Sequence, residues 1–180
     1  MHHRIRLIVV MAVTWLDIYE RKRFNRTEVI DIGFGENIVV NKLNTYYQRN
    51  NIQAYAYRNL QAKFREQPTD ICVDSRTNKR FMAIEVKSKR NKKALNFKSD
   101  FTINKDNVHQ LERQVEFSRL TGRVPFIVLY CRQGRGKKVL IYVFDSKVLL
   151  KKMKAGDKSI LAREFDEYNI KNELWRIVNK

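Results

Sequence analysis

The sequence predicts an α/β fold in which a mixed central β-sheet is flanked by helices. Two observations predict it. Two stretches carry apolar residues at spacings of three and four, as one face of a helix requires, and five short apolar runs have the length of strands. Their order along the chain is helix, three strands, helix and two strands. With 180 residues, 43% of them hydrophobic, the chain is long enough for one domain with a substantial core.

The first predicted helix begins at Glu36, after which apolar side chains recur at helical spacing through Leu43. Asn50 ends the pattern. Residues 53–58 alternate between polar and apolar side chains and predict a strand, and the polar, basic stretch 59–67 predicts a loop or a short helix.

The clearest local unit is a β-hairpin over residues 70–87, in which two apolar strands flank a polar, turn-rich bridge. A second amphipathic helix is predicted over residues 105–120, and Gly122 supplies a helix stop after it. The apolar runs 125–130 and 139–144 predict two further strands.

Charge narrows the class of partner. Lys and Arg number 37 against 19 Asp and Glu, which gives a net charge of +18 and a sequence pI of about 10.1. Self-repulsion of this size opposes a compact state, and a nucleic acid is the usual polyanion that offsets it. A membrane-surface protein and a lysine-rich thermophile protein are the alternatives.

The cysteines and the N-terminus predict an intracellular protein. Cys72 and Cys131 lie in apolar stretches without metal-ligand spacing, so we expect buried side chains in a reducing compartment. The apolar run 7–16 weakly imitates a signal peptide, but it lacks a small-residue cleavage site and is too short to cross a membrane. We expect a buried strand or helix there, and no membrane partner.

The register of the hairpin predicts a cluster of charged side chains. If the turn is centred between Thr77 and Asn78, Asp70 lies opposite Glu85, and opposed side chains have Cβ atoms about 5 Å apart. Lys87 then points to the same face as Glu85, and Val86 points into the core. A β-bulge would break this register.

Two carboxylates and an ammonium on one face suit phosphodiester hydrolysis. Mg²⁺ prefers oxygen ligands from one or two carboxylates, and it activates water and stabilises developing negative charge. Asp70 and Glu85 are therefore the candidate ligands, with the backbone carbonyl of Val86 as a third. Lys87 is the candidate to orient or deprotonate the water, or to balance phosphate charge. The alternative is a set of solvated edge residues or a surface ion pair.

These residues also resemble a known pattern. Pro68-Thr-Asp70, fourteen further residues and Glu85-Val-Lys87 resemble the PD-(D/E)XK nuclease motif. The surrounding order resembles archaeal-type Holliday junction resolvases, in the helix that opens with Gly35-Glu36, in the hairpin strands, and in the run Gln110–Gly122 followed by Val124-Pro-Phe-Ile-Val. The likeness covers roughly residues 33–145.

The resemblance implies a restriction-endonuclease-like nuclease core and a homodimer that binds four-way DNA junctions and makes paired symmetric nicks with Mg²⁺, for which Mn²⁺ can substitute. Glu36, Asp70, Glu85 and Lys87 fall on the catalytic positions, and Glu36 joins the metal ligands. Without the resemblance, Glu36 is an ordinary acidic residue in a first helical turn.

The resemblance also divides the chain. It implies a nuclease domain over residues 33–145, an N-terminal extension over 1–32 packed on the core, and a partly helical C-terminal extension over 146–180. The stretch between Glu36 and Asp70 is longer than is usual for the family, which bears on junction specificity more than on nuclease activity.

Basic runs on both sides of the hairpin predict DNA contacts. The residues assigned to them are Arg58, Lys63, Arg65, Lys89, Arg90, Lys92, Lys93, Gln110 and Arg113. The alternative for the charged runs is a solvated face. Phe97 and Phe101 either stack on bases or pack in the core or a dimer, and His109 is expected on the surface of the second helix.

Two other functions stay open. One is a PD-(D/E)XK endonuclease without junction specificity, and the other is a non-catalytic nucleic-acid-binding module.

Overall fold

The computed structural model describes residues 34–59, 67–76 and 81–170. The chain divides into two units, residues 1–32 and residues 33–180, and the described residues all belong to the second. The predicted N-terminal extension with its apolar run therefore lies outside the described residues, as do Lys63 and Arg65.

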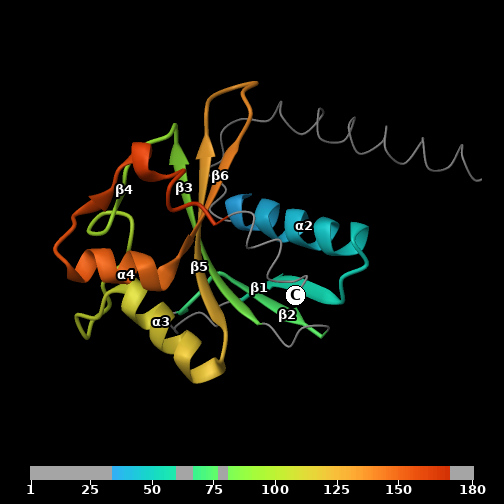
Figure 1. The fold of residues 1–180 in the computed structure, drawn as a ribbon, viewed down its shortest axis with the longest axis horizontal. Helices are drawn as coiled ribbons and strands as arrows, with labels where there is room; N and C mark the ends of the chain where they lie inside the picture. The colour runs from blue at the N-terminus through green and yellow to red at the C-terminus, as the bar shows by residue number, and fades with distance from the viewer. Residues whose placement is uncertain (1–33, 60–66, 77–80, 171–180) are drawn as a thin grey trace, which may run out of the picture. The chain divides into compact units, whose positions relative to one another are not determined.

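A five-stranded mixed sheet forms the centre of the second unit, with strand order β1-β2-β3-β5-β6 (Figure 1). Its strands are β1 (Ala54–Arg58), β2 (Ile71–Ser75), β3 (Met82–Arg90), β5 (Val124–Arg132) and β6 (Leu140–Asp145). β3 and β5 run parallel, and the other neighbours are antiparallel. The predicted mixed sheet flanked by helices is confirmed. Four of the five expected strands lie within two residues of their predicted bounds, and β3 extends three residues further than predicted, to Arg90.

Helices cover both faces of the sheet (Figure 1). They are α2 (Phe34–Arg49), α3 (Gln110–Thr121) and α4 (Ser146–Lys154). A small second sheet pairs β4 (Leu95–Asn96) with β7 (Ser159–Ile160), and the 3-10 helix η2 (Ala162–Glu164) follows it.

The sheet separates two hydrophobic cores. On one face, Leu43 and Tyr47 of α2 pack against a core that includes Ile84. On the other face, Leu111 of α3 joins a core with Ile127. Because successive side chains of a strand point to opposite faces, the alternation carries Val86 to the α2 side, as predicted, and Glu85 and Lys87 to the α3 side.

The tail of the described chain contributes three buried side chains to the second core, and Ile170 at its end packs against the first. The three, Leu149, Ile160 and Phe165, are all fully buried. The predicted helical content of the tail is confirmed by α4. Phe97 and Phe101 are also buried, at 3% and 4% exposure, so they pack in the core of this chain and present no ring for base stacking.

The second helix begins five residues later than predicted, and the reason is a cap. His109 is the N-cap residue: its Nδ1 accepts a hydrogen bond from Leu111 N, and the Glu112 carboxylate accepts one from His109 N. His109 Nε2 is hydrogen-bonded to Phe97 O at 2.8 Å. The expectation of a surface histidine within the helix is therefore wrong, because this ring is half-buried and fixes where the helix starts.

Candidate active site

The site lies where β2 and β3 part. The two strands pair in the predicted register, with Ile71 opposite Ile84, and Asp70 N then donates to Ile84 O at 3.1 Å. At the next position the Asp70 side chain replaces the backbone carbonyl as acceptor: its Oδ2 accepts a hydrogen bond from Val86 N at 2.7 Å. The backbone ladder thus ends in a carboxylate, which places Asp70 opposite Glu85.

Burial and charge act on this pair together. Glu85 is only 4% exposed. Burial first, and the neighbouring charge of Glu85 second, raise the pKa of Asp70 to about 7, although the Val86 N–H and the Lys87 ammonium both act to lower it. Two carboxylates are therefore held together at a position where ionising both is costly.

Lys87 and Gln110 complete the cluster from above the sheet. The Lys87 ammonium lies 2.9 Å from Glu85 Oε1 and donates to Gln110 Oε1 at 2.8 Å. Gln110 Nε2 donates to the same Glu85 oxygen at 2.7 Å. Gln110 Oε1 also accepts a hydrogen bond from Thr102 N at 3.2 Å. Since Gln110 is the first residue of α3, the helix start is tied directly to β3.

The aromatic ring of Phe101 adds to the setting of the ammonium, with Lys87 Nζ 5.0 Å from the ring centroid. The sequence assigned Gln110 to DNA contact. In the structure, Gln110 is only 9% exposed. Its side chain is hydrogen-bonded to both Lys87 and Glu85 and orients both. This role has no signal in the sequence, because it depends on how α3 packs against the sheet.

Glu36 lies in the first turn of α2 and forms an ion pair with Arg58, whose Nη2 is 2.6 Å from Glu36 Oε2. That turn lies close to β3 at Gly35, which has no side chain. A Cβ atom at this position would lie only 2.7 Å from Ser88 Oγ. Arg58 ends β1 opposite Ile71, so the ion pair lies at the same end of the sheet as Asp70.

The structure brings together Asp70, Glu85 and Lys87, but it does not gather all three predicted carboxylates. Within residues 34–59, 67–76 and 81–170, no three His, Cys, Asp or Glu side chains form a group able to hold a metal ion. Glu36 is instead engaged by Arg58.

The Asp70–Glu85 pair nevertheless fits a divalent cation chemically. Two carboxylates share one ammonium, so the fully ionised cluster carries net negative charge in a buried place. Mg²⁺ is commonly held by one or two carboxylates and completes its shell with water and phosphate oxygens. Asp70 and Glu85 are thus the residues that would hold it here.

Comparison with known proteins gives a structural likeness only. No family model and no curated protein matches the chain. A solved structure does match: Hjc of Archaeoglobus fulgidus, described as a Holliday junction resolvase from an archaeal hyperthermophile, at a TM-score of 0.52 and 19% identity, over 78% of this chain and 97% of that chain. The fold is that of the Hjc structure. The family resemblance in the sequence thus has a counterpart in three dimensions.

Several predicted DNA contacts in this Hjc-like fold have structural partners. Lys89 Nζ lies 2.6 Å from Asp100 Oδ2 and donates to Ala94 O, and Lys92 Nζ lies 2.8 Å from Asp166 Oδ2. Both lysines therefore fasten later segments of the chain to the end of β3.

The remaining predicted contacts differ in exposure. Arg113 Nη2 donates to Thr102 Oγ1 at 3.0 Å, beside the Gln110 network. Arg90 and Lys93 are exposed after the site.

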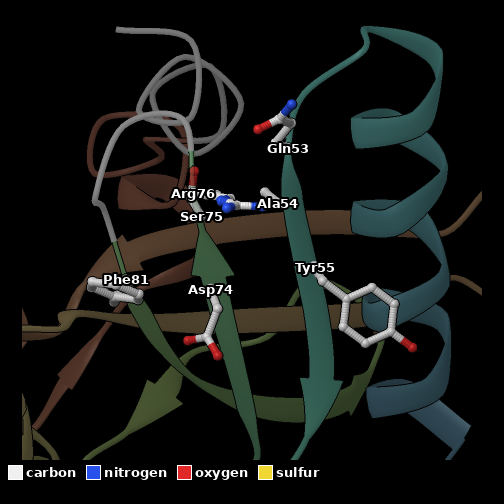
Figure 2. A pocket seen from close by; sticks show the side chains of 7 residues that line it. All are labelled: Gln53, Ala54, Tyr55, Asp74, Ser75, Arg76 and Phe81. Atoms are coloured by element: carbon white, nitrogen blue, oxygen red, sulfur yellow. The ribbon is translucent and has the colours of Figure 1, made fainter.

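The other end of the sheet carries none of the predicted site residues. Figure 2 shows an open hollow there, with Tyr55 of β1, Asp74 of β2 and Phe81 among its lining side chains. In the described part of the chain, no helix has the length and apolar character needed to cross a membrane.

Proposed function

We propose that the protein is a structure-selective DNA endonuclease that resolves four-way junctions by paired, Mg²⁺-dependent phosphodiester cleavage. One observation carries this function: Asp70 and Glu85 are held side by side where two strands part, with the Lys87 ammonium bound to Glu85. The ordered sequence motifs, the fold of Hjc and the net charge of +18 support it.

Hydrolysis requires a water oxygen to bond to phosphorus while the bond from phosphorus to the leaving deoxyribose oxygen breaks. A divalent cation held by Asp70 and Glu85 would supply Lewis acidity and acidify bound water. Asp70 is fixed for this task by the Val86 N–H. Lys87 offsets the charge that develops on the phosphate, and its position is set by Glu85 and Gln110.

Two symmetric cuts in a four-way junction suit two copies of the chain related by a two-fold axis. We therefore propose a homodimer in which each copy contributes one Asp70–Glu85 site. The partner is DNA, whose phosphates match the positive charge of the protein.

The test uses the purified full chain on a four-way junction, a flap and a linear duplex, with Mg²⁺, Mn²⁺ or a chelator. We expect paired nicks in opposite strands of the junction, loss of cleavage with chelator, and at least a hundredfold loss in D70N and E85Q. Glu116→Gln is the matched control, because Glu116 is an exposed carboxylate that forms an ion pair with Arg119 on the surface of α3.

Each alternative has its own outcome. Equal cutting of junction and linear duplex would identify an endonuclease without junction specificity. Tight junction binding without cleavage under either metal would identify a non-catalytic binding module. Full cleavage by D70N would show that Asp70 is not needed for catalysis.

A further inference from the structure

We propose, on the basis of the function proposed above, that the hairpin between β5 and β6 is an arm that holds the phosphate backbone of double-stranded DNA leaving the active site. The basic arm is defined as residues 132–139, with Arg135, Lys137 and Lys138 at its tip. It contacts DNA away from the scissile phosphate, and it contributes affinity without sequence preference.

The tip of the arm, residues 134–138, is exposed. The last paired residues of the hairpin are Cys131 and Leu140, and the chain beyond them extends past the end of β3 (Figure 1). Gly134 and Gly136 turn it with φ values of 113° and 73°. A Cβ on either glycine would have no neighbouring atom within 4 Å, so the tip is open to a ligand on its sides.

In the described ranges, no acidic side chain forms an ion pair with the charged tip of the arm. Arg135, Lys137 and Lys138 are exposed and have no ion-pair partner among the residues that the structure describes. The sequence has no Asp or Glu in residues 86–99 or 131–144, which hold the ends of β3 and β5 and the start of β6. Like charges gathered in this way are stabilised when phosphates approach them.

The basic run along β3 is a weaker candidate for the same role. Lys89 and Lys92 are both used to fasten segments of this chain, through Asp100 and Asp166. The exposed cations available to bind DNA therefore lie at the hairpin tip and at Lys93, near the base of the hairpin, and not at Lys89 or Lys92. Asn91 N donates to Arg132 O, which places that base beside the arm.

The parallel pairing of β3 and β5 fixes the direction of the arm. From Glu85, β3 continues to its end at Arg90, which lies beside Arg132 of β5. At about 3.3 Å per residue, the strand and the turn together carry the tip roughly 25 Å from Glu85. B-DNA rises about 3.4 Å per base pair, so a duplex that leaves the site along the direction of β3 and β5 would meet the arm roughly seven base pairs from the cut.

The composition of the tip fits a backbone contact. Residues 133–139 are Gln, Gly, Arg, Gly, Lys, Lys and Val, without an aromatic side chain. Lysine and arginine on a glycine-containing turn are suited to adjustable phosphate contacts.

The test compares two full-length variants that each lose three positive charges. One is R135Q/K137Q/K138Q, and the matched control is K42Q/R49Q/R76Q, whose three exposed residues lie along α2 and at the opposite end of β2. Binding is measured with Ca²⁺ in place of Mg²⁺, on junctions with arms of about five and about fifteen base pairs.

We expect the arm variant to bind the long-armed junction at least tenfold more weakly than the control, with a salt dependence reduced by about two to three units of slope. On the short-armed junction, the two variants should bind alike. Thermal unfolding reports whether each variant is folded, and the single reversal K137E repeats the comparison with one change in the open tip.

Equal losses in both variants on long arms would overturn the arm, because bulk charge would then explain the binding. A larger loss on short arms than on long arms would also overturn it. Failure of the unmodified protein to bind junctions would instead reject the proposed function itself, and that result is seen before either variant is compared.

Discussion

The side-chain oxygen of Gln110 accepts a hydrogen bond from the Lys87 ammonium at 2.8 Å. The same amide donates to Glu85 at 2.7 Å, so one uncharged side chain from α3 sets the relative position of two charged ones on β3. Residues that orient catalytic groups in this way commonly affect the rate more than the affinity for substrate.

Gln110→Leu should therefore slow single-turnover junction cleavage by about 10- to 100-fold and change the dissociation constant for the junction by less than about threefold. Leucine keeps the volume but leaves Lys87 and Glu85 without their shared partner. Gln53→Leu, at an exposed position at the far end of the sheet, is the control and should cleave normally. An equal loss of rate and affinity in Gln110→Leu would argue against an orienting role.

The stability of the metal-free protein should fall as pH rises from about 4 to about 7. The folded-state pKa of Asp70 is about 7 and its ordinary value is 3.8, so the folded state binds more protons than the unfolded state in this window. The raised pKa of Asp70 changes the free energy of unfolding by a few kcal/mol across this window, at about 1.4 kcal/mol per pKa unit. Urea unfolding at pH 5 and pH 8 checks it: Asp70→Asn should lose most of the pH dependence, and an unchanged dependence would show that other groups cause it.

Mg²⁺ should stabilise the protein at pH 8, because a cation bound only by the folded state adds a free energy that grows with its concentration. We expect a rise in melting temperature with Mg²⁺ that is absent in E85Q and retained in E116Q, whose exposed carboxylate lies on the surface of α3. A rise of the same size in E85Q would place the ion elsewhere.

Glu36 and Arg58 should separate into a catalytic and a structural role. Their ion pair is partly exposed, with side chains 18% and 37% accessible, so breaking it should cost no more than about 1 kcal/mol of stability. If Glu36 serves the reaction, Glu36→Gln lowers cleavage at least tenfold with little change in urea midpoint, while Arg58→Gln leaves the carboxylate in place and reduces cleavage less. Equal cleavage by Glu36→Gln and the unmodified protein would reduce Glu36 to an ion-pair partner.

The parts of the fold that the sequence predicts are those set by local pattern. A hairpin turn centred between Thr77 and Asn78 predicts that Asp70 lies opposite Glu85, and the observed pairing of Ile71 with Ile84 agrees with this register. The alternation of side chains along the strand directs Val86 to the α2 core.

The parts that sequence could not supply depend on distant partners. The start of α3 follows from a contact of His109 with Phe97, twelve residues earlier. Lys92 looked like a free cation in a basic run, but its partner Asp166 is 74 residues away. No local pattern reports such a pairing.

The burial of Leu149, Ile160 and Phe165 in the second core has a consequence for how this protein can be divided. Each buried side chain of this size contributes about 1.5 to 3 kcal/mol, and the three together approach the whole net stability of an ordinary domain. A chain ending at Asp145 would keep every proposed catalytic residue but would lose these three side chains from the second hydrophobic core, which lies on the same face of the sheet as Glu85 and Lys87. The tail is therefore no detachable module, and fusions or truncations of this protein have to leave it intact at least as far as Phe165.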